Sequence, residues 1–414
     1  MELRILRSEI LYYLCIIILP YWAKTDLRTI NIENMKRPFT TNLFRTCVAR
    51  TMALSLVAML FTLGNASAQV QDNKRDINDI VKLKFEARFD YIHDMIGTAQ
   101  RKDVSGVKVR YINMLLDGNI GDKFSYSWRQ RLNKMYSAQS FVDNMDWLYL
   151  AYRPTQNWEI AAGKQVVMIG GWEYDRAPID LYFCSEYWNN VTCYQFGASV
   201  AFMTNKGNDK LTLQVCQSPY DNAHENLFAF NLHWMGSHGC YTALHSLNFS
   251  EYHRGKYVAY VTLGNRFRFG DATIQLDLMN RGASAKELLF DNFSVMGEFS
   301  YLIADRVNVF ARATYDKVGD IYPEGLFLYP NTNIARVGGG VEYYPLGGRG
   351  NRDIRLHAAY AYSFGENGRM IDNSATARDK QSYLTVGLTW RIDVMSAVSS
   401  IIDKVHEKRA SKLQ

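Results

Sequence analysis

Five histidines lie close together in the second half of the chain, and one of them stands beside a serine. They are His224, His233, His238, His245 and His253. A hydrolase could use Ser246 as its nucleophile and a histidine as the general base that activates it. Such a base must lie within hydrogen-bond reach of the nucleophile. Adjacent residues of a strand point to opposite faces, however, so His245 and Ser246 cannot form this pair directly. The sequence therefore predicts no enzyme and no cofactor, and no metal-ligand spacing accompanies the histidines.

A second set of side chains is basic and recurs on one face of successive predicted strands. Inside a narrow pore, such fixed charge lowers the cost of moving an anion out of bulk water. Guanidinium groups also suit phosphate, because they bind two of its oxygens at once. The set that we predict to line an anion path comprises Lys82, Lys84, Arg88, Lys108, Arg110, Arg129, Arg131, Arg153, Arg266, Arg268, Arg312, Arg336, Arg355 and Arg391.

Acidic residues are interleaved with this basic series, so the two signs could instead pair and merely hydrate the wall. The acidic residues in question are Glu86, Asp90, Glu159, Asp277, Glu298 and Glu342. Because of this interleaving, the sequence indicates only a mild preference for anions.

The longest predicted loop, over 167–190, mixes glycines, aromatic residues and charges of both signs. A loop that folds inward needs unusual backbone conformations and polar contacts of this kind. Folded into a lumen, this loop would set its narrowest point, whereas the alternative is a loop on the external surface. The predicted constriction residues are Lys164, Glu173, Asp175, Arg176 and Asp180. The position of Lys164 in its strand predicts a side chain that points outward, unless Gly163 forms a bulge that turns it inward.

The elements that must position these residues are strands in which every second residue is apolar. In the first, Val81, Leu83, Phe85 and Phe89 alternate with charged residues. A two-residue period places the two sets on opposite faces of one strand, one suited to hydrocarbon and the other to water. Alternation and turn residues together predict about sixteen strands. Their expected spans are 80–91, 106–116, 123–133, 144–153, 157–166, 191–203, 210–218, 224–235, 240–252, 256–269, 272–281, 292–303, 306–316, 334–344, 354–364 and 382–394.

The connections between these strands alternate between short turns and longer loops, although the links near 219–223 and 253–255 are short where long ones are expected. Gly270-Asp271 predicts a type II′ hairpin turn. We predict an all-β fold, a closed antiparallel transmembrane β-barrel with short periplasmic turns and longer external loops. A soluble β-sandwich would also alternate. It is disfavoured because basic residues recur on the polar face and because an open sheet of this size would expose two edges.

The chain begins with a segment that predicts export. A basic stretch from Met35, an apolar run over 52–63 and Ala66-Ser67-Ala68 have the order of a secretory signal peptide, with cleavage expected after Ala68. Residues 1–34 are interpreted as an over-extended reading frame. Residues 1–68 hold eight of the 47 Lys and Arg and four of the 41 Asp and Glu. The mature chain would thus be nearly neutral, so overall charge gives no case for nucleic acid.

The remaining boundaries follow from this assignment. Residues 69–79 form a short periplasmic lead-in, 80–394 the barrel, and 395–414 an amphipathic tail with apolar residues at helical spacing. Cys184, Cys193, Cys216 and Cys240 remain after cleavage. Export permits disulfides, and a bridge between Cys193 and Cys216 and free thiols are both left open.

Several motifs resemble the phosphate-selective porin O/P family. They are the run Ala162-Gly163-Lys164-Gln165, the run Gly171-Trp172-Glu173-Tyr174-Asp175 with Ala177-Pro178-Ile179-Asp180, the turn Leu115-Leu116-Asp117-Gly118 and the strand Gly387-Leu388-Thr389-Trp390. The resemblance implies a 16-stranded outer-membrane porin, usually trimeric, in which a loop narrows a basic channel. It also implies the outer membrane of a Gram-negative bacterium, outer-membrane lipid as the surroundings, and small anions such as phosphate as solutes.

The function expected is passive diffusion of small hydrophilic solutes with a mild anion preference, phosphate among them. The alternatives are a phospholipase-like hydrolase in the barrel wall and a structural or binding barrel that conducts nothing.

Overall fold

The computed structural model describes residues 81–133, 142–220, 226–282, 291–319, 328, 330–347, 351–366, 370–371, 374–375 and 380–394. The predicted leader over 1–68, the lead-in over 69–79 and the tail over 395–414 lie outside the described residues. Among the residues described, no helix combines the length and the apolar character that a membrane span requires.

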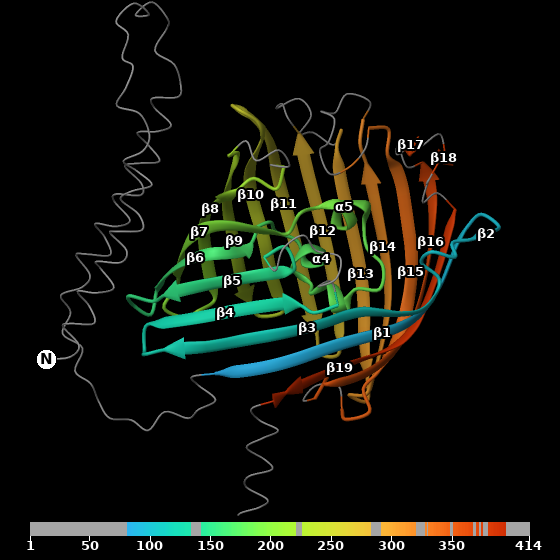
Figure 1. Cartoon of the computed structure of the whole chain (residues 1–414), viewed down its shortest axis with the longest axis horizontal. Coiled ribbons are helices and arrows are strands. Elements are labelled where there is room, and N and C mark those ends of the chain that lie inside the picture. The colour runs from blue at the N-terminus through green and yellow to red at the C-terminus, as the bar shows by residue number, and fades with distance from the viewer. Residues whose placement is uncertain are drawn as a thin grey trace, which may run out of the picture. The chain divides into compact units, whose positions relative to one another are not determined.

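In the described part of the chain, sixteen antiparallel strands form a closed ring, which confirms the predicted barrel (Figure 1). Each strand pairs with the next along the chain, and β1 pairs with β19 from Lys84↔Asp393 to Ile96↔Gln381. The strands of the ring are β1 (Lys82–Ile96), β3 (Gly106–Ile120), β4 (Phe124–Arg131), β5 (Met145–Tyr152), β6 (Trp158–Val166), β7 (Tyr194–Met203), β8 (Asp209–Gln217), β9 (Phe228–His238), β10 (Tyr241–His253), β11 (Lys256–Phe269), β12 (Ala272–Gly282), β13 (Phe293–Ile303), β14 (Val307–Lys317), β15 (Asn333–Tyr343), β16 (Ile354–Glu366) and β19 (Gln381–Asp393).

The short strands and helices lie in the connections. A two-residue strand, β2 (Ala99–Gln100), pairs with the end of β1, while β17 (Met370–Ile371) and β18 (Ser374–Ala375) pair with each other. The connection from β6 to β7 contains α4 (Trp172–Asp175), a 3-10 turn η3 (Pro178–Asp180) and α5 (Glu186–Asn190).

Two faces with opposite character explain why this sheet closes. On β8, Leu211 and Leu213 are 44% and 60% exposed, whereas Thr212 and Gln214 between them are each 2% exposed. A soluble sandwich would bury the leucines instead, so this inversion identifies an apolar outer wall around a polar interior. Closure also removes the two edges that an open sheet would expose.

Turns at one end of the barrel are short, as predicted. Gly270 has φ +59 and no positive φ occurs at Asp271, which is the geometry of a type II′ turn. At the other end most connections are long, but only Arg254 and Gly255 join β10 to β11. The link before β9 is longer than predicted, because β9 begins at Phe228 rather than at residue 224.

The inner face becomes apolar toward the long-loop end of β11 and β12. Val258 and Tyr260 are fully buried there, and Met279 nearly so. They pack with residues of the β6–β7 connection, among them Val167 and Tyr187, in the largest apolar cluster of the described residues. This connection therefore supplies the apolar cover that part of the inner wall requires.

Candidate functional site

The β6–β7 connection folds into the barrel, which excludes the alternative of an external surface loop. Near its start, the backbone N–H of Gly170 donates to Ser246 Oγ at 2.8 Å, and that of Gly171 donates to the Leu244 carbonyl at 3.0 Å. A Cβ on Gly170 would lie 2.6 Å from that carbonyl, and Gly171 has φ +98. Glycine is thus required where the loop meets β10, since a side chain would push the two backbones apart.

Four carboxylates on the inner faces of successive strands hold the loop. Asp277 of β12 accepts the Glu173 N–H at 2.8 Å, and Asp316 of β14 accepts the Glu186 N–H at 2.7 Å. Glu298 of β13 receives both terminal nitrogens of Arg176, at 2.6 and 2.9 Å. Glu342 of β15 accepts the Tyr182 hydroxyl at 2.6 Å. Charge-assisted bonds of this kind are among the stronger polar contacts in proteins.

Four wall arginines bind the backbone of the segment Pro178–Cys184, which we call the strap. Arg88 donates to the carbonyls of Ile179 and Leu181 at 3.2 and 2.5 Å, and Arg355 donates to Ile179 at 3.1 Å. Arg312 and Arg336 donate to the carbonyls of Phe183 and Cys184.

Two of these arginines also contact the Tyr182 ring of the strap. The guanidinium groups of Arg88 and Arg355 lie 4.7 and 5.6 Å from its centroid. This is the geometry of cation–π contacts. The strap is therefore clamped through both its carbonyls and its tyrosine.

The charged side chains of the loop are largely neutralised by this wall. Asp180 forms ion pairs with Arg355 at 2.8 Å and Arg391 at 2.7 Å. Burial alone would raise the pKa of Asp180, but these two arginines outweigh burial and lower it to about 2. Glu186 pairs with Arg336 at 2.8 Å. The side chain of Asp175 is exposed.

The predicted basic series divides into three groups. Arg88, Arg312, Arg336 and Arg355 are almost fully buried and hold the loop. Further residues are ion-paired along the wall or with the loop: Arg129 with Glu86 and Asp146, Arg131 with Asp146, Arg153 with Glu159, and Arg391 with Glu86 and Asp180. Those for which the described residues offer no ion pair are Lys82, Lys84, Lys108, Arg110, Arg266 and Arg268.

Lys164 is apart from the other predicted constriction residues. Its Nζ lies 5.9 Å from the ring centroid of Phe196, an exposed residue of the outer wall. The inner position beside it belongs to Gln165, which is 3% exposed. Gly163 forms no bulge in the pairing of β6 with β5 or β7, so Lys164 keeps the outward parity.

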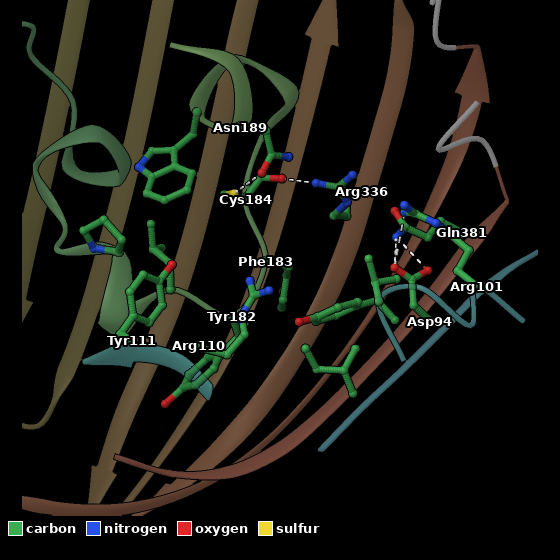
Figure 2. A pocket seen from close by; sticks show the side chains of 16 residues that line it. Asp94, Arg101, Arg110, Tyr111, Tyr182, Phe183, Cys184, Asn189, Arg336 and Gln381 are labelled. Carbon is green, nitrogen blue, oxygen red and sulfur yellow. Dashed lines mark hydrogen bonds and ion pairs between the residues drawn. The ribbon is translucent and has the colours of Figure 1, made fainter. Parts of the chain in front are cut away.

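Two cavities lie on either side of the strap. The first, which we call the loop-end cavity, has a volume of about 240 Å³ and is lined by Leu181, Tyr182 and Arg336. Figure 2 shows Arg101 and Gln381 converging on Asp94 at one side of it. The second, the turn-end cavity, has a volume of about 520 Å³. It is lined by six arginines, four carboxylates and several neutral polar residues.

The anchoring role of the wall carboxylates was not predicted from the sequence. Asp277, Glu298 and Glu342 were interpreted only as partners of basic residues, and Asp316 was not singled out. The available signal was their shared parity, since one carboxylate falls on the inner face of each of four successive strands. A row of this kind, beside a long loop with backbone donors, indicates an anchoring surface.

His224 lies outside the described residues, and the histidine and cysteine candidates within them form no reactive pair. The Ser246 hydroxyl donates to Asn248 at 2.6 Å and accepts from Gly170. His233 lies opposite Ser246 in the pairing of β9 with β10, yet no hydrogen bond joins them in the described segments. All four cysteines after the leader are free thiols, and no group of three or more metal-binding side chains is found in the described ranges.

Comparison with known proteins also indicates a porin. Residues 81–257 match the family model of the phosphate-selective porins O and P, which confirms over this segment the resemblance read from the sequence. Solved structures of similar fold include OmpT of Vibrio cholerae, with 15% identity, a TM-score of 0.53 and coverage of 75% of this chain and 97% of that chain. The outer membrane channel DcaP of Acinetobacter baumannii has 11% identity, a TM-score of 0.54 and the same coverage of both chains.

A further similar structure is the anion-selective porin from Comamonas acidovorans, with 11% identity and a TM-score of 0.52 over 75% of this chain and 99% of that chain. At these identities the structural matches establish the fold alone. No curated protein matches the chain.

Proposed function

We propose that this protein is an outer-membrane porin for passive diffusion of small hydrophilic solutes, with a mild preference for anions and with phosphate among the solutes. The observation that carries the proposal is the inverted barrel, which is apolar outside and charged within. The family match over residues 81–257 and the porin fold both support an outer-membrane channel.

The anion preference rests on the turn-end cavity, where arginines outnumber carboxylates by six to four. Arg266 and Arg268 account for most of this excess. The ion pairs that carboxylates of this cavity form with arginines are made to Arg176, Arg312, Arg355 or Arg391, and none is made to Arg266 or Arg268. Fixed positive charge at a narrow passage favours anions over cations.

Ion selectivity in planar bilayers tests the proposal. We expect the purified protein to conduct in KCl and its reversal potential in a KCl gradient to indicate chloride preference. The double substitution R266E/R268E should shift that potential toward cations, while K206E, a charge reversal at an exposed turn, should shift it far less. A protein that inserts but passes no current would instead be a structural or binding barrel. Hydrolysis of lipid by the purified protein would support the enzyme alternative.

The proposal also includes export and assembly. The mature chain would begin at Gln69, place its short turns in the periplasm and assemble as a homotrimer. N-terminal sequencing of protein from outer membranes tests the first point. Native mass measurement in detergent tests the last.

A further inference from the structure

Arg266 and Arg268 stand out among the arginines of the inner wall, because no described carboxylate lies within ion-pair distance of either. Both lie on the inner face of β11, two residues apart, and both line the turn-end cavity. Nearby arginines, namely Arg176 of the loop and Arg312 and Arg355 of the wall, all hold carboxylates. Two neighbouring guanidinium groups that form no ion pair with described residues therefore face this cavity.

Arg266 is also held in a fixed position. Its guanidinium lies 3.4 Å from the ring centroid of Trp172 in α4. Its Nε is buried, and no nitrogen of the guanidinium has a hydrogen-bond partner among the described residues. A guanidinium that is stacked and lacks an acceptor is prepared to bind an oxyanion, since little side-chain freedom would be lost on binding.

Neutral hydroxyl groups continue the site across the wall. Arg268 lies directly opposite Thr273 of β12, which lies opposite Ser300 of β13. Side chains in such positions are about 5 Å apart from one strand to the next. Thr273 and Ser300 both line the cavity, and neither hydroxyl has a side-chain partner in the described part of the chain. The row thus presents a cation followed by two unused hydroxyl groups.

We infer that the turn-end cavity binds hydroxylated organic anions of the sugar phosphate class, a deepening that rests on the proposed function. The anionic group binds the guanidinium groups of Arg266 and Arg268, which match phosphate oxygens in pairs. The sugar hydroxyls bind Thr273 and Ser300. A cavity of about 520 Å³ is within the range of sites for small organic molecules and is larger than an inorganic oxyanion requires.

Block of the ion current by glucose 6-phosphate tests the inference, with glucose and inorganic phosphate as comparison solutes. We expect glucose 6-phosphate to reduce the current at lower concentration than either of the others. R268Q should raise its half-blocking concentration about tenfold, the loss of a charged hydrogen bond at a partly exposed site. T273V should raise it several-fold for glucose 6-phosphate but leave phosphate unchanged. K206Q, which removes an exposed charge outside the cavity, serves as the matched control and should change neither value.

The outcomes separate this inference from the proposed function. Conductance in KCl without block by glucose 6-phosphate would overturn the inference and leave the porin intact. Equal block by inorganic phosphate, insensitive to T273V, would overturn the substrate class. If no current flows, the proposed function fails, and calorimetric titration of glucose 6-phosphate into the detergent-solubilised protein decides the inference: binding weakened by R268Q supports it, and absence of binding overturns it.

Discussion

The substitution E298Q tests whether the inner wall fixes the loop. Glu298 is the carboxylate with the most arginine contacts at the loop. It receives two hydrogen bonds from Arg176 of the loop and further bonds from Arg312 of β14. Glutamine keeps the shape of the side chain but has no negative charge, and it places an amide donor beside two guanidinium groups. Both arginines would lose their strongest partner.

The size of the effect follows from burial. The side chains of Glu298 and Arg312 are 5% and 2% exposed, and that of Arg176 is 22% exposed. Removing one partner of a buried ion pair costs about 3–5 kcal/mol, and the partial exposure of Arg176 favours the lower end. A cost of about 3 kcal/mol corresponds to a shift of roughly a hundredfold in the equilibrium between the bound and released loop. Because the strands retain their pairing, this energy should act mainly on the loop rather than on the whole barrel.

Single-channel recording measures this release. We expect E298Q to show frequent current fluctuations that are rare in the unmodified protein, together with a lower midpoint of heat-induced unfolding on gels. E159Q is the matched control, because Glu159 also holds two cations, Arg153 and Lys210, but lies away from the loop. Both substitutions remove one negative charge and should shift selectivity slightly toward anions. Equal fluctuation in E298Q and E159Q, or none in either, would refute the idea that the wall carboxylates fix the loop.

Two further substitutions and one titration extend this reasoning. D180N removes the shared partner of Arg355 and Arg391. We therefore expect a stronger chloride preference, measured by reversal potential, and a lower midpoint of heat-induced unfolding. An unchanged reversal potential would contradict this prediction. Because the pKa of Asp180 is lowered to about 2, its contribution to stability should be complete above about pH 4 and lost only as the pH falls toward 2. Current noise recorded over this pH range measures the loss, and noise that rises already near pH 5 would argue against this assignment. G264V should unseat the loop, since a Cβ there would lie 2.8 Å from Gly171 Cα, and noise like that of the unmodified protein would show that the loop tolerates the displacement.

The fold could be predicted because the alternation of apolar and polar residues along each strand identifies its outer and inner faces. The predicted span 256–269 coincides with β11, where apolar and polar residues alternate to the turn. The prediction of strand ends failed where apolar residues occupy the inner face as well as the outer face. The first strand was expected to end at residue 91 but continues to Ile96, and Ile92 is an inward residue that is 1% exposed. An apolar side chain can face inward there because it is almost fully buried, at the wall of a cavity that Leu181 of the strap also lines.

The site was predictable only in part. Strand parity places the arginines on the inner face, because a period of two is a property of the local backbone. It carries no information on what fills the space opposite them. The wall arginines that hold the strap bind the backbone carbonyls of Ile179, Leu181, Phe183 and Cys184. Every residue type supplies such a carbonyl. No pattern of side chains could therefore reveal that the strap, rather than a solute, occupies these arginines.

Arg88 and Arg268 show what this difference means for function. Both are arginines on the inner face of a strand, yet Arg88 is 1% exposed and holds Asp90 and the strap, whereas Arg268 is exposed to the turn-end cavity. A charge compensated within 3 Å contributes little to the field that a passing ion meets, since the pair acts as a small dipole. The selectivity of the barrel should therefore follow the few arginines that the loop leaves unpaired, not the number of arginines in the wall. The paired ones determine where the loop lies, and so decide which of the others a solute can reach.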